Sequence, residues 1–186
     1  VMVLGAGNDR AEGGDANSSD FNSSRFGIEV GAINKVADLA SLEVNADPFS
    51  NPGASILISA PGSSMASTSR LFENANGSNF GGDYETAQGT SFATPVVSGV
   101  VALMLEANPN LGYRDIQKIL AYSARSVDDP NTNWHINDAT DWNGGGLHFS
   151  RDYGFGNVDA LAAVRLAETW NTQQTAANEV SSVRQS

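Results

Sequence analysis

One serine stands where its hydroxyl could act as a nucleophile. Ser91 follows Gly89 and Thr90 and opens an apolar run that ends near Glu106. A run of about 15 residues favours a buried helix over a strand, and Pro95 falls within about its first turn, where a missing N–H is tolerated. Ser91 would then lie at a helix N-terminus, where free amides and the helix dipole stabilise a developing anion. A serine there is also a common helix cap, and the bare pattern leaves both interpretations open.

A second polar group follows the first apolar segment. Val1 to Leu4 reads as a buried strand, and it is followed by Gly5-Ala6-Gly7 and then Asn8. A strand that feeds Gly-Ala-Gly can also open a dinucleotide-binding loop, but that motif requires a third glycine and a helix directly after it. Arg10 stands at the third position and a polar loop over 11–24 follows, so the dinucleotide interpretation is the weaker one.

Composition narrows the classes of partner. The 186 residues carry 10 Lys and Arg against 21 Asp and Glu, a net charge of −11, which argues against nucleic acid and an acidic membrane surface and suits calcium, cationic ligands or a basic peptide. The chain has no cysteine, which excludes disulfides and thiolate metal sites. No apolar run reaches the roughly 18 residues of a membrane span, so we expect no membrane segment.

The elements expected around these residues alternate along the chain. Further strands are expected at 26–33 and 55–60, a polar loop or hairpin at 63–82, a second helix at 113–123 and a last helix from 160 to about 170. Strands alternating with helices predict an α/β architecture with a largely parallel sheet. Residues 1–171 are expected to form one domain portion, and 172–186 a linker or tail.

The residues around the serine carry a family resemblance. Gly89 to Pro95, Gly-Thr-Ser-Phe-Ala-Thr-Pro, resembles the nucleophile motif of the subtilisin-like serine proteases, and Gly5 to Asn8 resembles their strand end that bears an oxyanion-binding asparagine. The stretches 105–117 and 153–160 are most similar to the kexin/furin branch. The resemblance implies a three-layer subtilisin-like fold and a serine endopeptidase that forms an acyl-enzyme on Ser91 with Asn8 in the oxyanion hole.

The same resemblance implies where the rest of the active site lies. In this family the chain order is Asp, then His, then Ser, so the catalytic Asp and His are expected upstream of Val1. We therefore expect a partial domain whose N-terminal part is missing, and no peptidase activity from these residues alone. His135 and His148 follow the serine in a polar insertion and are expected to be surface residues.

Substrate and metal roles are also implied by resemblance. The expected substrate wall is Gly5, Ala6 and Gly7, with Asp9 at its rim favouring a cationic side chain. Structural calcium is expected at Asp15 and Asp20, which stand about one residue away from the family's acids, while Asn51 stands where a glutamate is expected. Turn and loop acids without a metal are the alternative for both aspartates.

Partners and compartment follow from the family in the same way. Peptide or protein substrates are expected, with a P domain following the tail that begins at Asn171, and a secreted or endomembrane location. Two other functions stay open on the sequence: a subtilase-shaped binding protein that has lost its upstream Asp or His, and a dinucleotide-binding α/β enzyme.

Overall fold

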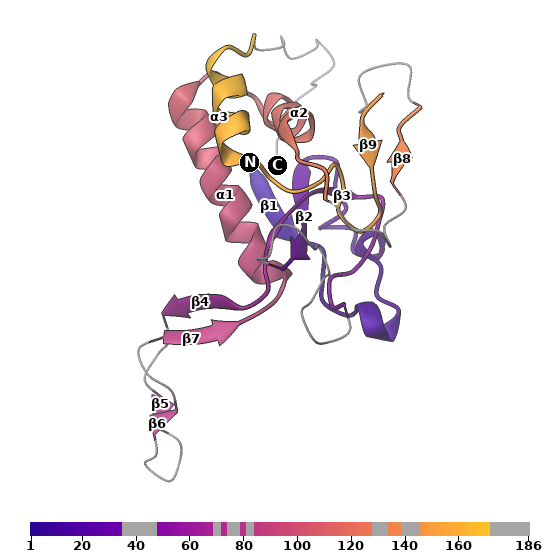
Figure 1. Cartoon of the computed structure of the whole chain (residues 1–186), viewed down its shortest axis with the longest axis vertical. Coiled ribbons are helices and arrows are strands. Elements are labelled where there is room, and N and C mark those ends of the chain that lie inside the picture. The colour runs from indigo at the N-terminus through magenta and orange to yellow at the C-terminus, as the bar shows by residue number, and fades with distance from the viewer. Residues whose placement is uncertain are drawn as a thin grey trace, which may run out of the picture.

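A parallel sheet and three helices form the body of the chain (Figure 1). The computed structural model describes residues 1–34, 48–68, 72–73, 79–80, 84–127, 134–138 and 146–171. The sheet has the order β1 (Met2–Gly5), β2 (Gly27–Ile33), β3 (Ile56–Pro61), with all pairs parallel. The helices are α1 (Thr90–Ala107), α2 (Tyr113–Ser123) and α3 (Ala160–Glu168). The predicted α/β class, the parallel sheet and the three helices are thus confirmed.

Short elements lie between these larger ones. Two 3-10 turns follow β1, namely η1 (Arg10–Glu12) and η2 (Ala16–Ser18). Within the described ranges there are also three small antiparallel pairs: β4 (Met65–Thr68) with β7 (Tyr84–Ala87), β5 (Phe72–Glu73) with β6 (Asn79–Phe80), and β8 (His135–Ile136) with β9 (His148–Phe149). The described residues of the segment predicted as a loop or hairpin thus take part in antiparallel pairs, and β4 and β7 leave the body beside the first turn of α1 (Figure 1).

The main core lies on the helical face of the sheet. Ile28, Val30 and Ala32 point from β2 into a cluster with apolar side chains of all three helices, including Val97 and Met104 of α1. Figure 1 shows α1 and α3 lying side by side on this face. Alternate strand residues face the same side of a sheet, so these three positions all point into the core. This burial explains why the predicted strand carries β-branched and small residues there.

The other face of the sheet is covered by loops. The turn after β9 lies close to β2, where a Cβ placed on Gly31 would lie 3.3 Å from the Asp152 carbonyl oxygen. The Ser59 hydroxyl donates to the Tyr153 carbonyl at 3.3 Å. As a result, every residue of β2 is buried, so this strand has no solvent-facing side.

The proline of α1 lies deeper in the helix than predicted. The helix begins at Thr90, which puts Pro95 in the second turn and not in the first. A proline lacks the N–H that would bond to the carbonyl four residues earlier. The Ser91 carbonyl therefore receives no α-helical hydrogen bond from position 95, and the backbone just after the serine is held by fewer bonds than a regular helix.

The length and hydropathy of α1 contradict the expectation that no apolar run in the chain is long enough to span a membrane. Its 18 residues have a mean hydropathy of 1.4, enough for a membrane-crossing helix by those two measures. Six of its residues are buried against the sheet and neighbouring helices, and core helices commonly meet the same measures.

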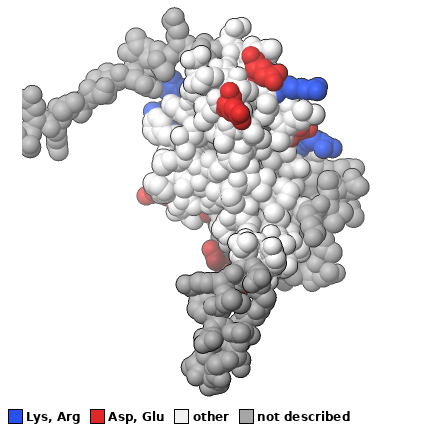
Figure 2. All heavy atoms as spheres, turned by 90° about the vertical axis from the view of Figure 1, so that its left-hand side faces the viewer, with Lys and Arg blue, Asp and Glu red and all other residues white. Residues whose placement is uncertain are grey.

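Figure 2 shows the face that carries α1 and α3, where charged side chains are sparse over the described part of the chain.

Side-chain carboxylates fix the starts of the two later helices. Asp159 accepts the Ala162 N–H at 2.9 Å and so caps α3. Asp115 accepts the Gly112 N–H at 3.0 Å at the start of α2, as expected for an acid in the first turn. Asp115 also accepts the Trp170 indole N–H at 3.1 Å, which ties the end of the last helical segment to α2.

Glu29 is a buried acid in the middle of β2. Its side chain is 2% exposed, and neither carboxyl oxygen has a hydrogen-bond partner among the described residues. Burial raises the pKa of Glu29, the nearby Ser55 hydroxyl lowers it in part, and the Asp15 carboxylate raises it further. An acid whose folded pKa is raised contributes stability below its unfolded pKa, and that contribution is lost as the pH rises through the folded pKa.

Replacing this acid with its neutral isostere should stabilise the protein. We expect Glu29→Gln to raise the free energy of unfolding at pH 8 by roughly 1–2 kcal/mol, because it removes an unpaired buried charge. The gain should shrink towards pH 4, where Glu29 is protonated. Urea unfolding from pH 4 to 8 measures both, with Glu106→Gln, an exposed acid on α1, as the matched control. A Glu29→Gln gain that does not vary with pH would contradict this account.

Candidate active site

Backbone hydrogen bonds hold the turn that precedes Ser91 in place. The Gly89 N–H donates to the Gly62 carbonyl at 2.8 Å, and the Gly89 carbonyl accepts from the Phe92 N–H at 3.0 Å. Gly89 has φ +148°, a conformation that L side chains rarely adopt. A Cβ on Gly62 would lie 2.7 Å from the Gly89 carbonyl oxygen, so both positions require glycine. This turn presents Ser91 at the start of α1 as an exposed residue.

Asn8 reaches the same place from the end of β1. Its Oδ1 accepts the Thr90 N–H at 2.8 Å, so its Nδ2 points away from that bond. A Cβ placed on Gly89 would lie 3.1 Å from Ser91 Oγ and 3.5 Å from Asn8 Nδ2. The hydroxyl and the amide donor therefore border one small space, which only a glycine leaves open. Neither Ser91 Oγ nor Asn8 Nδ2 has a hydrogen-bond partner within the described residues.

Thr90 joins the two segments, and sequence reasoning assigned it no role. The residue is 3% exposed, and its Oγ1 accepts the Gly7 N–H at 3.3 Å while its carbonyl accepts the Thr94 hydroxyl at 2.8 Å. A Cβ on Gly5 would lie 2.8 Å from Thr90 Oγ1. The sequence held a signal for this contact: a small residue with a hydroxyl group stands beside Ser91, and glycines at the end of β1 leave room for it.

The expected substrate wall lies directly beside this pair. Gly7 has φ +99°, and a Cβ there would lie 2.4 Å from Asn51 Nδ2, so this position cannot carry a side chain without rearrangement. Ala6 is 4% exposed and packs in a small apolar cluster, whereas Asp9 is exposed. The substrate roles of Gly5, Ala6, Gly7 and Asp9 stay predictions.

Asn51 holds the backbone of this wall. Its N–H donates to the Gly7 carbonyl at 3.0 Å, and its Oδ1 accepts the Asp9 N–H at 2.8 Å. A carboxylate could accept the second bond, but the amide also brings its Nδ2 against Gly7 and Gly14 without adding a negative charge. Asn51, which stands where the resemblance led us to expect a glutamate, thus has a structural use here.

The described residues do not complete a calcium site around Asp15 and Asp20. Asp15 Oδ1 accepts both the Asn17 N–H and its side-chain amide, and Asp15 Oδ2 pairs with Arg151 at 3.2 Å. Asp20 is exposed, and the described part of the chain contains no group of three acids or histidines able to hold a metal ion. Calcium needs six to eight oxygen ligands, and calcium binding at Asp15 and Asp20 stays a prediction.

The geometry gives little support to the dinucleotide alternative. The segment after Gly5-Ala6-Gly7 forms only the short turn η1, not the helix that a dinucleotide loop requires. His135 is exposed, as predicted. His148 is half-buried, against expectation, with its ring 5.0 Å from that of Trp134 and its Nε2 buried without a partner among the described residues. No hydrogen bond links either histidine to Ser91 in that part of the chain.

Comparison with known sequences decides the family. The profile of the subtilase family, Peptidase S8, matches residues 1–156. The chain belongs to the subtilase family. It is 31% identical to kexin of Saccharomyces cerevisiae over 173 residues, which covers 91% of this chain and 19% of kexin. It is 41% identical to human furin over 90 residues, which covers 47% of this chain and 10% of furin. The subtilase chain thus spans a fifth or less of these relatives.

Solved structures agree with this assignment. The serine protease of Aeromonas sobria matches with a TM-score of 0.69 and 25% identity over 87% of this chain and 32% of its own. Fervidolysin of Fervidobacterium pennivorans, a keratinolytic enzyme related to subtilisin, matches with a TM-score of 0.61 and 25% identity over 89% of this chain and 22% of its own. The subtilisin-like fold predicted for this subtilase is therefore shown, and the chain spans about a third or less of these solved chains.

Proposed function

We propose that this subtilase chain is the serine-bearing part of a serine endopeptidase, with Ser91 as the nucleophile and Asn8 as the oxyanion-binding residue. One observation carries the proposal: the exposed Ser91 hydroxyl and the Asn8 amide border the same space across Gly89. Ser91 also lies at the N-terminus of α1, whose first amides have no partner inside the helix. A nucleophile, a carboxamide donor and a backbone N–H, here that of Ser91, are among the parts that acyl transfer requires.

The reaction proposed for this site has two halves. Ser91 Oγ attacks the carbonyl carbon of the peptide bond while a base takes its proton, and the carbonyl oxygen becomes an anion held by Asn8 Nδ2 and the Ser91 N–H. The carbon–nitrogen bond then breaks, the base returns the proton to the departing amine, and an ester remains on Ser91. A water molecule hydrolyses this ester by the same steps and regenerates the hydroxyl.

The base of this reaction is proposed to come from outside these 186 residues. A serine hydroxyl requires a base within hydrogen-bond reach, and among the described residues no histidine bonds to Ser91. We propose that the catalytic His and Asp belong to an upstream part of the same protein. Most of the exposed positions of α1 are small or apolar, such as Pro95, Gly99 and Ala102, which suits packing against such a part.

The substrate is proposed to be a polypeptide with a basic residue before the cleaved bond. Asp9 is exposed next to Asn8, and the whole chain carries a net charge of −11, so a cationic side chain would be attracted. The similarity to kexin and furin supports peptide substrates. A secreted or endomembrane location is proposed on the same similarity.

A fluorophosphonate probe tests the nucleophile directly. The full-length protein should form one covalent adduct, located by mass spectrometry on the peptide that contains Ser91, and Ser91→Ala should not react. Ser98→Ala is the matched control, because Ser98 is an exposed serine of the same helix and should leave labelling unchanged. Labelling that persists in Ser91→Ala would reject the proposal. Peptide hydrolysis by the isolated 186 residues that depends on Ser91 would reject an external base.

A further inference from the structure

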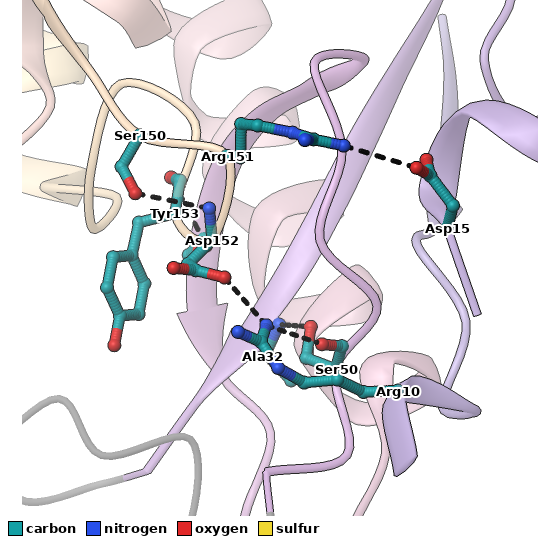
Figure 3. Close-up of polar contacts among 9 residues, drawn as sticks. Arg10, Asp15, Ala32, Ser50, Ser150, Arg151, Asp152 and Tyr153 are labelled. Atoms are coloured by element: carbon teal, nitrogen blue, oxygen red, sulfur yellow. Dashed lines mark hydrogen bonds and ion pairs between the residues drawn. The ribbon is translucent and has the colours of Figure 1, made fainter. Parts of the chain in front are cut away.

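Arg10 fastens the loop that carries Asn8. The strand β1 ends at Gly5, and the chain then passes through Asn8 into the short turn η1. Arg10 Nη1 lies 2.6 Å from Asp152 Oδ1 and 3.3 Å from the Ser50 carbonyl oxygen, and the Arg10 N–H donates to the Phe49 carbonyl at 3.3 Å. Figure 3 shows the guanidinium group extending to both Ser50 and Asp152. One side chain thus links three separate segments.

This ion pair differs from an ordinary surface pair. The side chains of Arg10 and Asp152 are 28% and 25% exposed, whereas those of the neighbouring pair Arg151 and Asp15 are 62% and 42% exposed. Exposed ion pairs contribute little to the stability of the fold because water and salt screen the attraction between the charges. A short, partly buried pair with additional hydrogen bonds is screened less. The Arg10 pair is therefore the stronger attachment of the two seen in Figure 3.

Asp152 belongs to a rigid turn. Its N–H donates to Ser150 Oγ at 3.1 Å, and Ser150 and Gly154 exchange two backbone hydrogen bonds of 2.9 and 2.8 Å. Gly154 has φ +61° and is in such close contact with β3 that a Cβ there would lie 2.5 Å from the Leu57 carbonyl. Tyr153 is 1% exposed. The carboxylate that binds Arg10 is thus fixed relative to the sheet.

We propose that Arg10 is a positioning residue for the Asn8 amide, an inference that rests on the function proposed above. Arg10 follows Asn8 by two residues, so movement of η1 moves the Asn8 backbone. A bond from Thr90 fixes only Oδ1 of Asn8, and the direction of Nδ2 also depends on where its main chain lies. Asn51, which bonds to Gly7 and Asp9 on either side of Asn8, and the Arg10–Asp152 pair together hold that main chain. Oxyanion stabilisation depends on such placement of the donor.

A double-mutant cycle on the full-length protein tests this proposal. We expect Arg10→Gln to lower kcat about tenfold with KM changed less than twofold, because the amide acts on the transition state and not on substrate binding. In the Asn8→Ala background the same substitution should have no further effect on kcat. Asp152→Asn should behave like Arg10→Gln, and the exchanged pair Arg10→Asp with Asp152→Arg should recover part of the loss.

Controls separate this role from a general loss of structure. Arg151→Gln removes the exposed pair of the same chemistry and should change kcat less than twofold. Thermal unfolding of each variant shows that assays run on folded protein, and Asp152→Asn stands in if Arg10→Gln does not fold. Equal losses in the wild-type and Asn8→Ala backgrounds would overturn the proposal, as would a lower unfolding temperature with unchanged kcat. If Asn8→Ala itself leaves kcat unchanged, both this proposal and the oxyanion role fail, while the Ser91 labelling result stands apart.

Discussion

Ser91→Ala is expected to lower kcat of the full-length protein by about 10⁶-fold, a figure taken from a subtilisin and therefore borrowed within the family. The loss is large because no other group of the site can form the covalent intermediate. KM should change little, since the hydroxyl adds almost nothing to binding of the ground state. Steady-state kinetics with a fluorogenic peptide measures both constants.

The fold of this variant should be intact. Ser91 is exposed, and its hydroxyl makes no hydrogen bond within the described residues, so the change in unfolding free energy should stay within about 0.5 kcal/mol. Ser98→Ala is again the matched control: its hydroxyl bonds only to the Thr94 carbonyl at 3.0 Å, and its kcat should equal that of the wild type. A Ser91→Ala enzyme that keeps a tenth or more of its activity would exclude Ser91 as the nucleophile.

Local pattern was enough to find the elements and the two polar groups. The apolar run after Ser91 predicted α1, and the β-branched segment near Ile28 predicted β2, because these patterns follow the geometry of each element. The placement of Asn8 beside Ser91 came from resemblance to a family. No periodicity indicates which strand end meets which helix start, and this contact depends on Thr90 and on glycines that allow close approach.

Other features depend on neighbours that are distant in sequence. A strand pattern with Glu29 between Ile28 and Val30 suggests a solvent-facing acid, yet loops cover that face and bury it. Arg10 and Asp152 are 142 residues apart, and nothing in either segment indicates the other. The start of α1 at Thr90 moved Pro95 into the second turn, because Gly89, not Ser91, is the residue that precedes the helix. Tertiary contacts decided each case.

Replacing Asn8 separates its two hydrogen-bonding ends. Asn8→Asp keeps an oxygen that can accept the Thr90 N–H, but it replaces the Nδ2 donor with a negatively charged oxygen facing the developing oxyanion. We expect Asn8→Ala to lower kcat by roughly 10²–10³-fold, the cost known for loss of such a donor in a subtilisin. Asn8→Asp should lower it further, because it adds repulsion to the loss of the donor.

The order of these two variants is the informative result. If Asn8 served mainly to hold the backbone through Thr90, the aspartate would preserve that bond at 2.8 Å and keep more activity than the alanine. An oxyanion role predicts the reverse order, with KM within about twofold of wild type in both. Asn110 is an exposed asparagine after α1. Asn110→Asp adds the same charge far from the turn and should leave kcat unchanged.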